Sequence, residues 1–292
     1  MAAPGELKTV LITGGTDGLG RAAALLLAEP ATAGYRVFAA GRSAEKRATL
    51  AQLARERQLP LETVEMDVCD DASVGRAVAE VRSKAGSIDV LVNSAGVGYI
   101  AAMEEITIEH LRQQFETNFF GAVRVIQAVL PGMRQRRSGR ILNMSSMAGK
   151  IALPLFGPYS GSKFALEGMT DALRLEVYPF GIDVVLIEPG YIPTNFQAAS
   201  IELSSPYAAA AESSPYARVY RNFQRSWKKS TSRVRYTPED CARVVLRALR
   251  DTPPRPRYRV TRRAVVASWA KRLLSDRALD RFMIRTFRLE RD

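Results

Sequence analysis

Short apolar runs alternate along the chain with longer amphipathic stretches in which apolar residues recur at helical spacing. Such runs are typical of parallel strands buried on both faces, and the stretches between them are long enough for crossover helices. The predicted strands are residues 9–13, 36–40, 62–66, 90–93, 140–144, 183–188 and 258–261. The predicted helices are residues 19–27, 44–56, 72–84, 108–134, 159–177 and 238–249. Right-handed crossovers then predict an α/β fold, a doubly wound Rossmann-type parallel sheet with helices on both faces.

A glycine-rich turn follows the first predicted strand. Residues 13–20 read Thr-Gly-Gly-Thr-Asp-Gly-Leu-Gly and lead directly into a predicted helix. Gly14 and Gly18 lack side chains and let the backbone approach a pyrophosphate, while Gly20 permits close packing of the helix on the strand. The helix N-terminus adds amide donors and the positive end of the helix dipole. Glycines also occur in plain turns, but this position between a strand and a helix predicts a dinucleotide-binding site.

The residue after the second predicted strand indicates which dinucleotide is bound. A cofactor with a free ribose 2′-hydroxyl is usually met there by an acidic side chain, whereas this chain has Arg42, 22 residues after Gly20. A guanidinium forms charge-assisted hydrogen bonds with a 2′-phosphate. The sequence therefore predicts NADP(H) in preference to NAD(H). The alternative is that Arg42 is a solvated arginine in the first turn of a helix.

Tyr159 and Lys163 are four residues apart at the start of a predicted helix, so their side chains project from the same face. A nearby ammonium favours the phenolate, and we expect it to lower the pKa of Tyr159 from the reference value of about 10. Tyr159 can then accept a proton from a secondary alcohol or donate one to a carbonyl, while Ser146 hydrogen-bonds the same oxygen. Taken alone, such a pair is a common feature of helix surfaces.

Together these residues resemble the short-chain dehydrogenase/reductase family, in its single-domain branch, over about residues 7–262. The TGxxxGxG turn of the family corresponds to residues 13–20, and its Asn-Asn-Ala-Gly segment to residues 93–96, where Ser94 replaces the second asparagine. The stretch 159–176 further resembles the hydroxysteroid and retinol dehydrogenase-like members. The resemblance implies an oxidoreductase that transfers a hydride to or from a nicotinamide cofactor.

The resemblance also assigns roles to individual residues. Because the serine of the family lies 13 residues before its tyrosine, Ser146 rather than its neighbour Ser145 is the implied catalytic serine. The implied catalytic set is Asn118, which completes a proton relay, with Ser146, Tyr159 and Lys163. The implied cofactor-binding residues are Thr13, Gly14, Thr16, Gly18, Leu19, Gly20, Arg42, Asp67, Val68, Asn93, Ala95, Gly96, Tyr159, Lys163, Pro189, Gly190, Ile192 and Thr194. For Asn93 a purely structural role between strands is an equal alternative.

The segments expected to line the substrate site are largely apolar. Residues 97–100, 151–156 and 191–192 hold few charges that could pair with a carboxylate or phosphate. They predict a small lipophilic substrate, namely a ketone or secondary alcohol of the steroid, retinoid or long-chain type. Residues 197–232 carry five aromatic residues among alanine, serine and proline, where the family has its substrate-covering loop and helix. A mobile lid is predicted there, and the alternative is a surface insertion whose aromatic residues pack on the core.

Charge is placed unevenly along the chain, with net −3 over residues 1–217 and net +15 over residues 218–292. Residues 1–261 are predicted to form one NAD(P)-binding catalytic domain with a substrate loop at about 191–235, and residues 262–292 a basic amphipathic helical C-terminal extension. Two apolar stripes run along this extension: Val265, Val266, Trp269, Leu273 and Leu274, then Leu279, Phe282, Met283 and Phe287.

Apolar stripes of this kind must be covered by the body of the protein, by a second subunit or by an anionic membrane. We expect packing on the body or on a partner to prevail, with weak, salt-sensitive binding to anionic membranes as the other outcome. A homo-oligomer is expected. Nucleic acid is not expected as a partner, because the basic segment has no recognisable reading module.

Composition excludes several other classes of protein. With 47% apolar and 25% charged residues, the chain is an ordinary globular protein. Cys69, Cys241 and His110 are its only cysteines and histidine, too few for a disulfide framework or a Cys/His zinc cluster, and no metal is expected. A Ser-His-Asp hydrolase would need His110, which is predicted to be a solvated helix residue. No apolar stretch approaches a membrane span and no secretory signal is recognisable, so a cytoplasmic protein is expected.

Two hypotheses from different classes follow. The first is an NADP(H)-dependent oxidoreductase that interconverts a secondary alcohol and a carbonyl on a lipophilic substrate. The alternative is a non-catalytic, dinucleotide-sensing regulatory or scaffold protein that uses the basic C-terminus as its interaction surface. Loss of a catalytic residue would favour the alternative, and the sequence retains all four.

Overall fold

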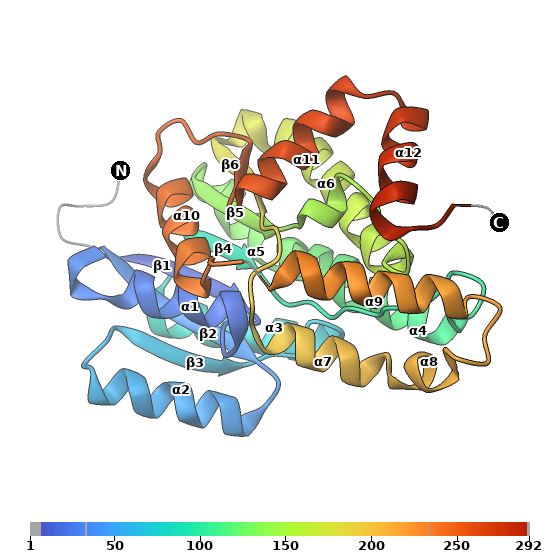
Figure 1. Ribbon diagram of the computed structural model, residues 1–292. Helices are drawn as coiled ribbons and strands as arrows, with labels where there is room; N and C mark the ends of the chain where they lie inside the picture. Colours follow the sequence, from blue (N-terminus) through green and yellow to red (C-terminus); the bar gives the residue numbers. More distant parts are fainter. Residues whose placement is uncertain (1–6, 33, 233, 291–292) are drawn as a thin grey trace.

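The computed structural model describes residues 7–32, 34–232 and 234–290, and seven parallel strands of these residues form one sheet (Figure 1). The strands are β1 (Lys8–Thr13), β2 (Tyr35–Gly41), β3 (Leu61–Glu65), β4 (Val90–Asn93), β5 (Gly139–Met144), β6 (Ile182–Glu188) and β7 (Arg257–Arg259). Their order is β3-β2-β1-β4-β5-β6-β7, so the strand order reverses between β1 and β4. In doubly wound folds ligands bind at this switch point, beyond the carboxyl ends of the strands. The predicted fold class is confirmed.

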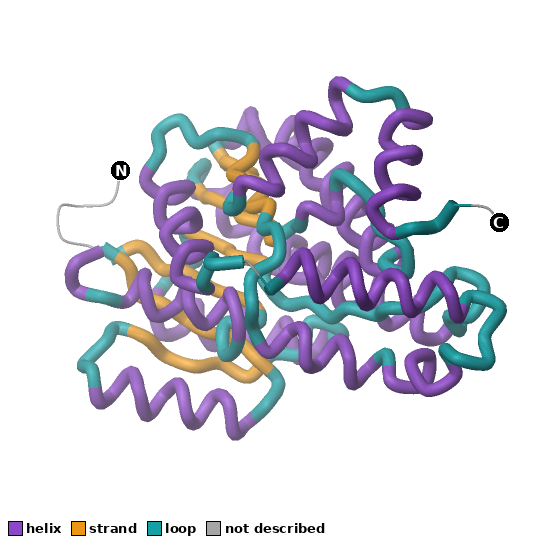
Figure 2. The backbone as a smooth tube through the Cα atoms, in the orientation of Figure 1, coloured by secondary structure: helices purple, strands orange, loops and turns teal. Residues whose placement is uncertain are grey.

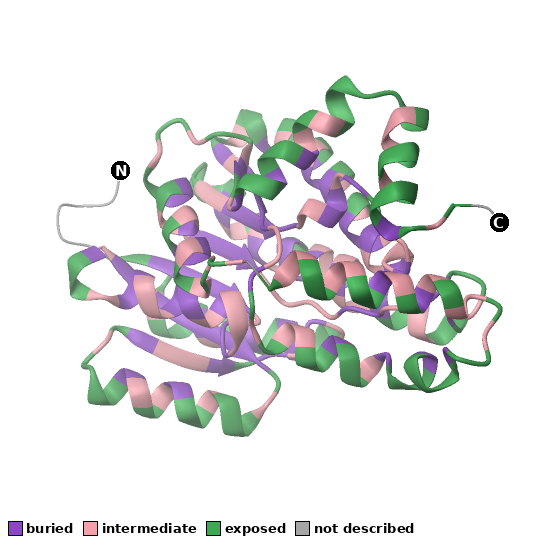
Figure 3. Cartoon of the chain, in the orientation of Figure 1, coloured by how far each residue is buried: buried purple, intermediate pink, exposed green. Residues whose placement is uncertain are grey.

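Helices cover both faces of the sheet because successive strand side chains point to opposite sides. In β1, Val10 and Ile12 pack in the core cluster that holds α1, α2 and α10, whereas Leu11 packs in the opposite cluster with α3, α5 and α6. The helices are α1 (Gly18–Ala28), α2 (Ala44–Glu56), α3 (Asp71–Ala85), α4 (Ile108–Phe115), α5 (Gly121–Arg136), α6 (Gly157–Val177), α7 (Asn195–Leu203), α8 (Ser205–Ala210), α9 (Ala217–Thr231), α10 (Pro238–Arg250), α11 (Arg262–Leu273) and α12 (Asp276–Phe287). Figure 2 shows the strands lying among the helices, and Figure 3 shows that buried residues gather in the strands while the outer sides of the helices are exposed.

The predicted helix 108–134 is interrupted in the structure. Helices α4 and α5 are joined through a π-helical turn, Glu116–Phe120, which widens the helix by one residue per turn. Such turns often occur at functional sites. Here the turn carries Asn118, whose side chain is buried. It accepts a hydrogen bond from the amide of Val97, in the segment that follows β4. A hydrophobic pattern does not reveal a π-turn, because one extra residue shifts the helical period only locally.

The prediction that His110 is a solvated helix residue is wrong. Its Nδ1 lies 2.6 Å from the hydroxyl oxygen of Tyr207, and its ring stacks on Tyr99 with centroids 4.9 Å apart. His110 therefore joins α4 to α8, an element 97 residues further along the chain. Contacts over such a separation depend on the tertiary fold and leave no local pattern.

Several helices in the last third of the chain lie outside the sheet and the helices that cover it. Residues 197–232 form helices α7, α8 and α9 beside the carboxyl ends of the strands, and α12 lies against α9 (Figure 1). The predicted catalytic domain begins and the predicted extension ends with residues 1–6 and 291–292, which lie outside the described residues. The division of the chain at residue 261 stays a prediction. None of the described helices is long and apolar enough to cross a membrane.

Candidate active site

A cavity of about 460 Å³ opens where the strand order reverses. Its walls are formed by the segments that follow β1, β2, β3 and β4, together with the π-helical turn. The lining residues are Thr13, Gly14, Thr16, Asp17, Ala40, Gly41, Arg42, Ser43, Lys46, Met66, Asp67, Val68, Cys69, Ala95, Gly96, Val97 and Thr117. Eight of the predicted cofactor-binding residues are among them: Thr13, Gly14, Thr16, Arg42, Asp67, Val68, Ala95 and Gly96.

The glycine-rich turn forms one wall of this cavity and tolerates no larger residue at its tightest points. A Cβ atom on Gly14, whose φ is +62°, would lie 2.9 Å from the backbone nitrogen of Ala95. A Cβ on Gly20 would lie 2.4 Å from the carbonyl oxygen of Gly14. The Thr13 hydroxyl accepts hydrogen bonds from the amides of Ser94 and Ala95, at 3.1 and 3.2 Å. The turn thus presents bare backbone at the N-terminus of α1, as an anionic pyrophosphate requires.

Two cationic side chains stand at the rim of the cavity, beyond β2. The Arg42 guanidinium is largely exposed, with Nη1 3.6 Å from Oδ2 of Asp67, and Lys46 forms an ion pair with Asp17. Asn195 donates a second hydrogen bond to Asp17, at 3.0 Å. Burial raises the pKa of Asp17, but the hydrogen bonds from Lys46, the Gly18 amide and Asn195 outweigh it and lower the pKa overall. Sequence reasoning missed Lys46, although it stands four residues after Arg42, in the first turn of α2.

The four predicted catalytic residues meet beyond the carboxyl ends of β4 and β5. The Ser146 side chain hydrogen-bonds Tyr159. The Lys163 ammonium donates to the Met144 carbonyl at 2.8 Å and lies 5.8 Å from the centre of the Tyr159 ring. The Asn118 side chain accepts a hydrogen bond from the Val97 amide at 2.8 Å and donates one to the Ser162 hydroxyl at 3.1 Å. The π-helical turn, the segment after β5 and the start of α6 therefore come together at this point.

Burial shifts the pKa values of the tyrosine and the lysine in opposite directions. It raises the pKa of Tyr159 to about 12, against the hydrogen bond from Ser146, and it lowers the pKa of Lys163 to about 8, against the charge of Glu167. The expected net lowering of the Tyr159 pKa is not found, because burial outweighs the interactions that favour the phenolate. Tyr159 is consequently protonated at neutral pH.

We expect the reduction of a carbonyl substrate to slow at alkaline pH, because Lys163 loses its charge as the pH rises through about 8 while Tyr159 keeps its proton. A profile of kcat/KM against pH should be level below pH about 7 and fall above pH about 8. The variant Lys163→Arg keeps its charge over this range and should lose that falling limb. A limb that begins only near the ordinary lysine pKa of about 10.4 would contradict the shift.

The other predicted cofactor-binding residues lie outside the cavity lining. Asn93 donates to the Asn143 side chain at 2.9 Å, so it joins β4 to β5, in agreement with its structural alternative. Leu19 packs on the core. The segment from Pro189 to Thr194, which includes Ile192, crosses the glycine-rich turn, and a Cβ on Gly18 would lie 3.7 Å from the Cβ of Thr194. Gly190 has no room for a side chain, because its Cβ would lie 2.3 Å from the Thr261 hydroxyl.

Aromatic rings cover Tyr159 on the side away from the sheet. Phe156 and Phe196 lie against it, with ring centroids 6.1 and 5.7 Å from that of Tyr159. Phe156 in turn contacts Phe223 and Trp227 of α9, at 5.6 and 5.2 Å. Sequence reasoning placed Phe223 and Trp227 in the predicted lid and Phe156 in a segment that lines the substrate site, but it missed Phe196 as a neighbour of Tyr159. The surroundings of the Tyr159 ring are therefore apolar and aromatic.

A family model described as short chain dehydrogenase matches residues 8–203. The chain belongs to the short-chain dehydrogenase/reductase family. It is 34% identical over 251 residues to retinol dehydrogenase 8 of Homo sapiens, covering 85% of this chain and 79% of that protein. It is 35% identical over 257 residues to human 17-beta-hydroxysteroid dehydrogenase type 1, covering 87% and 77%. A solved variant of the actinorhodin polyketide ketoreductase, with NADPH, shares 31% identity at a TM-score of 0.70, covering 84% of this chain and 90% of that one.

As a short-chain dehydrogenase/reductase, this chain is an oxidoreductase of a family that binds a nicotinamide dinucleotide and acts on CH–OH groups. The predicted family is thus confirmed.

Proposed function

We propose that this protein is an NADP(H)-dependent oxidoreductase that interconverts a secondary alcohol and a carbonyl on a lipophilic substrate, with Tyr159 as acid and base. The observation that carries the proposal is the convergence of Asn118, Ser146 and Lys163 around Tyr159, beside a cavity with Arg42 at its rim. A non-catalytic dinucleotide sensor has no need for this arrangement.

The cavity fits a nicotinamide dinucleotide by its shape and charge. The side-chain-free turn at Gly14 would hold the pyrophosphate, and Arg42 with Lys46 would hold a 2′-phosphate. Asp67 and Val68 line the wall that would receive the adenine. The bound cofactor supplies the hydride for reduction and takes it up in oxidation.

The protein side chains handle the proton. During reduction Tyr159 donates its phenolic proton to the carbonyl oxygen, and during oxidation its phenolate accepts the proton of the alcohol. The Ser146 hydroxyl, which hydrogen-bonds Tyr159, holds the same substrate oxygen in place. The positive charge of Lys163 stabilises the phenolate that reduction leaves on Tyr159. Asn118 holds the segment at Val97 in place and belongs to the route by which Tyr159 regains its proton.

The aromatic cover of Tyr159 supports a lipophilic substrate. Phe156, Phe196 and Trp227 offer flat apolar surfaces and no charge to a group bound over Tyr159. The names of two relatives refer to retinol and to hydroxysteroids, both of which are lipophilic alcohols. A screen of steroids, retinoids, acyl ketones and sugars for NADPH consumption tests the proposal, and activity confined to sugars would contradict it.

Two further expectations stay predictions: a homo-oligomer and a cytoplasmic location. The mass of the purified protein in solution, measured by light scattering, checks the first. Localisation of the tagged full chain in cells checks the second.

Replacing Arg42 with aspartate tests the cofactor assignment. The change removes a charge-assisted hydrogen bond to the 2′-phosphate and adds repulsion, so NADPH binding should weaken by about 10- to 100-fold while NADH binding changes little. Titration of cofactor fluorescence measures both constants. Arg55→Asp is the matched control, since Arg55 is an exposed residue of α2 outside the cavity lining. If the wild type binds NADH as tightly as NADPH, Arg42 does not select the cofactor.

A further inference from the structure

Helix α11 turns its large apolar residues away from the protein. Its buried positions are the small residues Ala264 and Ala267. Val266, Trp269 and Leu273, spaced three and four residues apart, lie on the opposite side of the helix and are 66%, 51% and 74% exposed. Figure 3 shows this outer side as exposed along the helix. A helix that docks on a core turns its large apolar residues inward, whereas α11 turns them outward.

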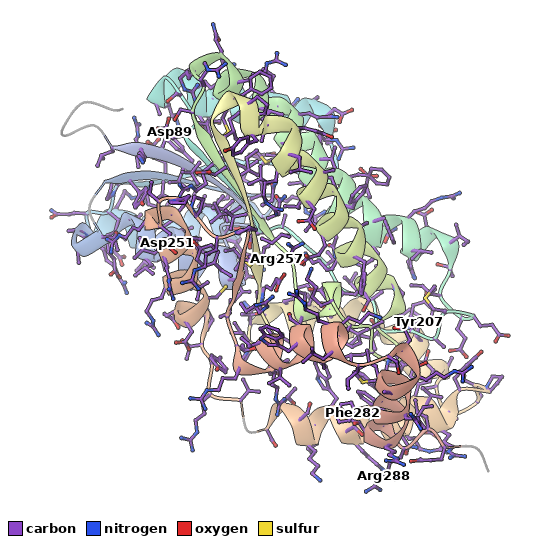
Figure 4. The ribbon with its side chains drawn as sticks, turned by 90° about the horizontal axis from the view of Figure 1, so that it is seen from above. Asp89, Tyr207, Asp251, Arg257, Phe282 and Arg288 are labelled. Carbon is purple, nitrogen blue, oxygen red and sulfur yellow. The ribbon has the colours of Figure 1, made fainter. Side chains whose placement is uncertain are left out.

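Helix α12 continues the exposed apolar surface, although it is itself docked. Phe287 stacks on Phe223 of α9 with centroids 5.7 Å apart, and Met283 packs in the same cluster. Phe282 remains 59% exposed and Ile284 39% exposed. Figure 4 places Phe282 at the edge of the molecule, far from Arg257 near its centre. The body of the protein therefore leaves the apolar stripe of α11 uncovered among the described residues, and its packing on a partner stays a prediction.

Basic side chains surround these exposed apolar residues. Residues 262–290 contain eight arginines and lysines against three acidic residues. The Arg272 guanidinium lies 5.9 Å from the centre of the Trp269 ring, and Lys271 pairs with Asp276 at 2.7 Å. Among the described residues, no carboxylate forms an ion pair with Arg262, Arg272, Arg277, Arg281 or Arg285. A surface of exposed valine, leucine and aromatic side chains within a field of free cations has the chemistry of an interfacial helix.

We propose that helices α11 and α12 form a docking surface for an anionic lipid bilayer. Val266, Trp269, Leu273 and Phe282 enter the boundary between headgroups and acyl chains, while the arginines contact lipid phosphates. Charge decides between this occupant and a second copy of the chain. Two such surfaces facing each other would oppose the same net charge of +5 on residues 262–290, whereas an anionic bilayer is complementary to it.

The test is co-sedimentation of the full chain with vesicles. Wild-type protein should pellet with vesicles of phosphatidylcholine that contain about one-third phosphatidylserine, should pellet much less with pure phosphatidylcholine, and should be released as salt rises. Trp269→Ser combined with Leu273→Ser should weaken the partition at least about tenfold. Both side chains are exposed, so the fold should be retained. Leu175→Ser is the matched control, since Leu175 is 76% exposed on α6.

Catalytic turnover separates this proposal from the proposed function. Reduction of a water-soluble carbonyl compound should be equal in the wild type, the double variant and the control, because none of the changed residues lies in the site. Failure of the wild type to pellet with anionic vesicles, or equal partition of the double variant, would overturn the docking surface. A double variant that loses an oligomeric state, while vesicle binding is absent throughout, would assign the surface to a second copy instead.

Discussion

Replacement of Tyr159 by phenylalanine is expected to lower kcat for carbonyl reduction about a hundredfold or more, with little change in NADPH binding. The substitution keeps the ring that packs against Phe156 and Phe196 and removes only the hydroxyl. Ser146 then has no phenol to hydrogen-bond, and no other acid reaches the substrate oxygen in the proposed mechanism. General acid–base groups contribute about 10²- to 10⁴-fold to rates, which sets the size of the loss.

Stopped-flow measurement of a single turnover separates proton transfer from product release, and NADPH titration checks that the cavity is intact. Tyr191→Phe is the matched control. Tyr191 belongs to the same aromatic cluster, through an edge contact with Trp227 at 5.4 Å, and its hydroxyl has no role in the mechanism. Near-normal turnover by the Tyr159 variant would refute this tyrosine as the acid and base.

A second large effect is expected for stability, at a cluster of buried charges beside α6, the helix that carries Tyr159 and Lys163. Glu188 is fully buried, and Glu167 is nearly so. Arg257 joins them, with Nη2 3.3 Å from Glu167 and Nε 3.2 Å from Glu188, and it also pairs with Asp171. Lys150 contributes a further bond to Glu167 at 2.5 Å. Because Glu188 directly precedes the Pro189–Gly190 segment, the cluster ties β6, β7 and α6 together beside the site.

Arg257→Met should lower the free energy of unfolding by about 2–3 kcal/mol. Removing one member of a buried pair typically costs about 3–5 kcal/mol, and the partial exposure of Arg257 reduces this value. Urea unfolding followed by circular dichroism measures the change. Arg255→Met is the matched control, since Arg255 is exposed two residues earlier. An unchanged unfolding midpoint would show that the remaining cations compensate fully.

The deficit of this variant should depend on pH in a defined direction. Burial, with the charge of Glu167, raises the pKa of Glu188 above its ordinary value, so the folded state binds a proton there more tightly than the unfolded state. Stability from this group is therefore present at low pH and lost as the pH rises through the raised pKa. The Arg257→Met variant leaves Glu188 with less compensating charge, so its deficit should be smaller at pH about 5 than at pH about 8.

The sequence by itself determined the fold class and most of the candidate site. The strand predictions agree with the structure to within two residues at every end, because strands buried on both faces leave uninterrupted apolar runs. The glycine-rich turn and the spacing of Tyr159 and Lys163 could also be recognised from the sequence. Each depends only on residues that are close along the chain, in a tight turn or within one turn of a helix.

Only the tertiary structure decided what lies around those residues. The π-helical turn that holds Asn118, the partners of His110 and the aromatic cover of Tyr159 all depend on segments far apart in the chain. The direction of the Tyr159 pKa shift also required the fold, because the burial of the phenol sets it. The same holds for α11: helical spacing indicated an apolar stripe, but which face meets the protein depends on how closely the helix packs. With only alanines able to fit against the body, the larger side chains of α11 face outward.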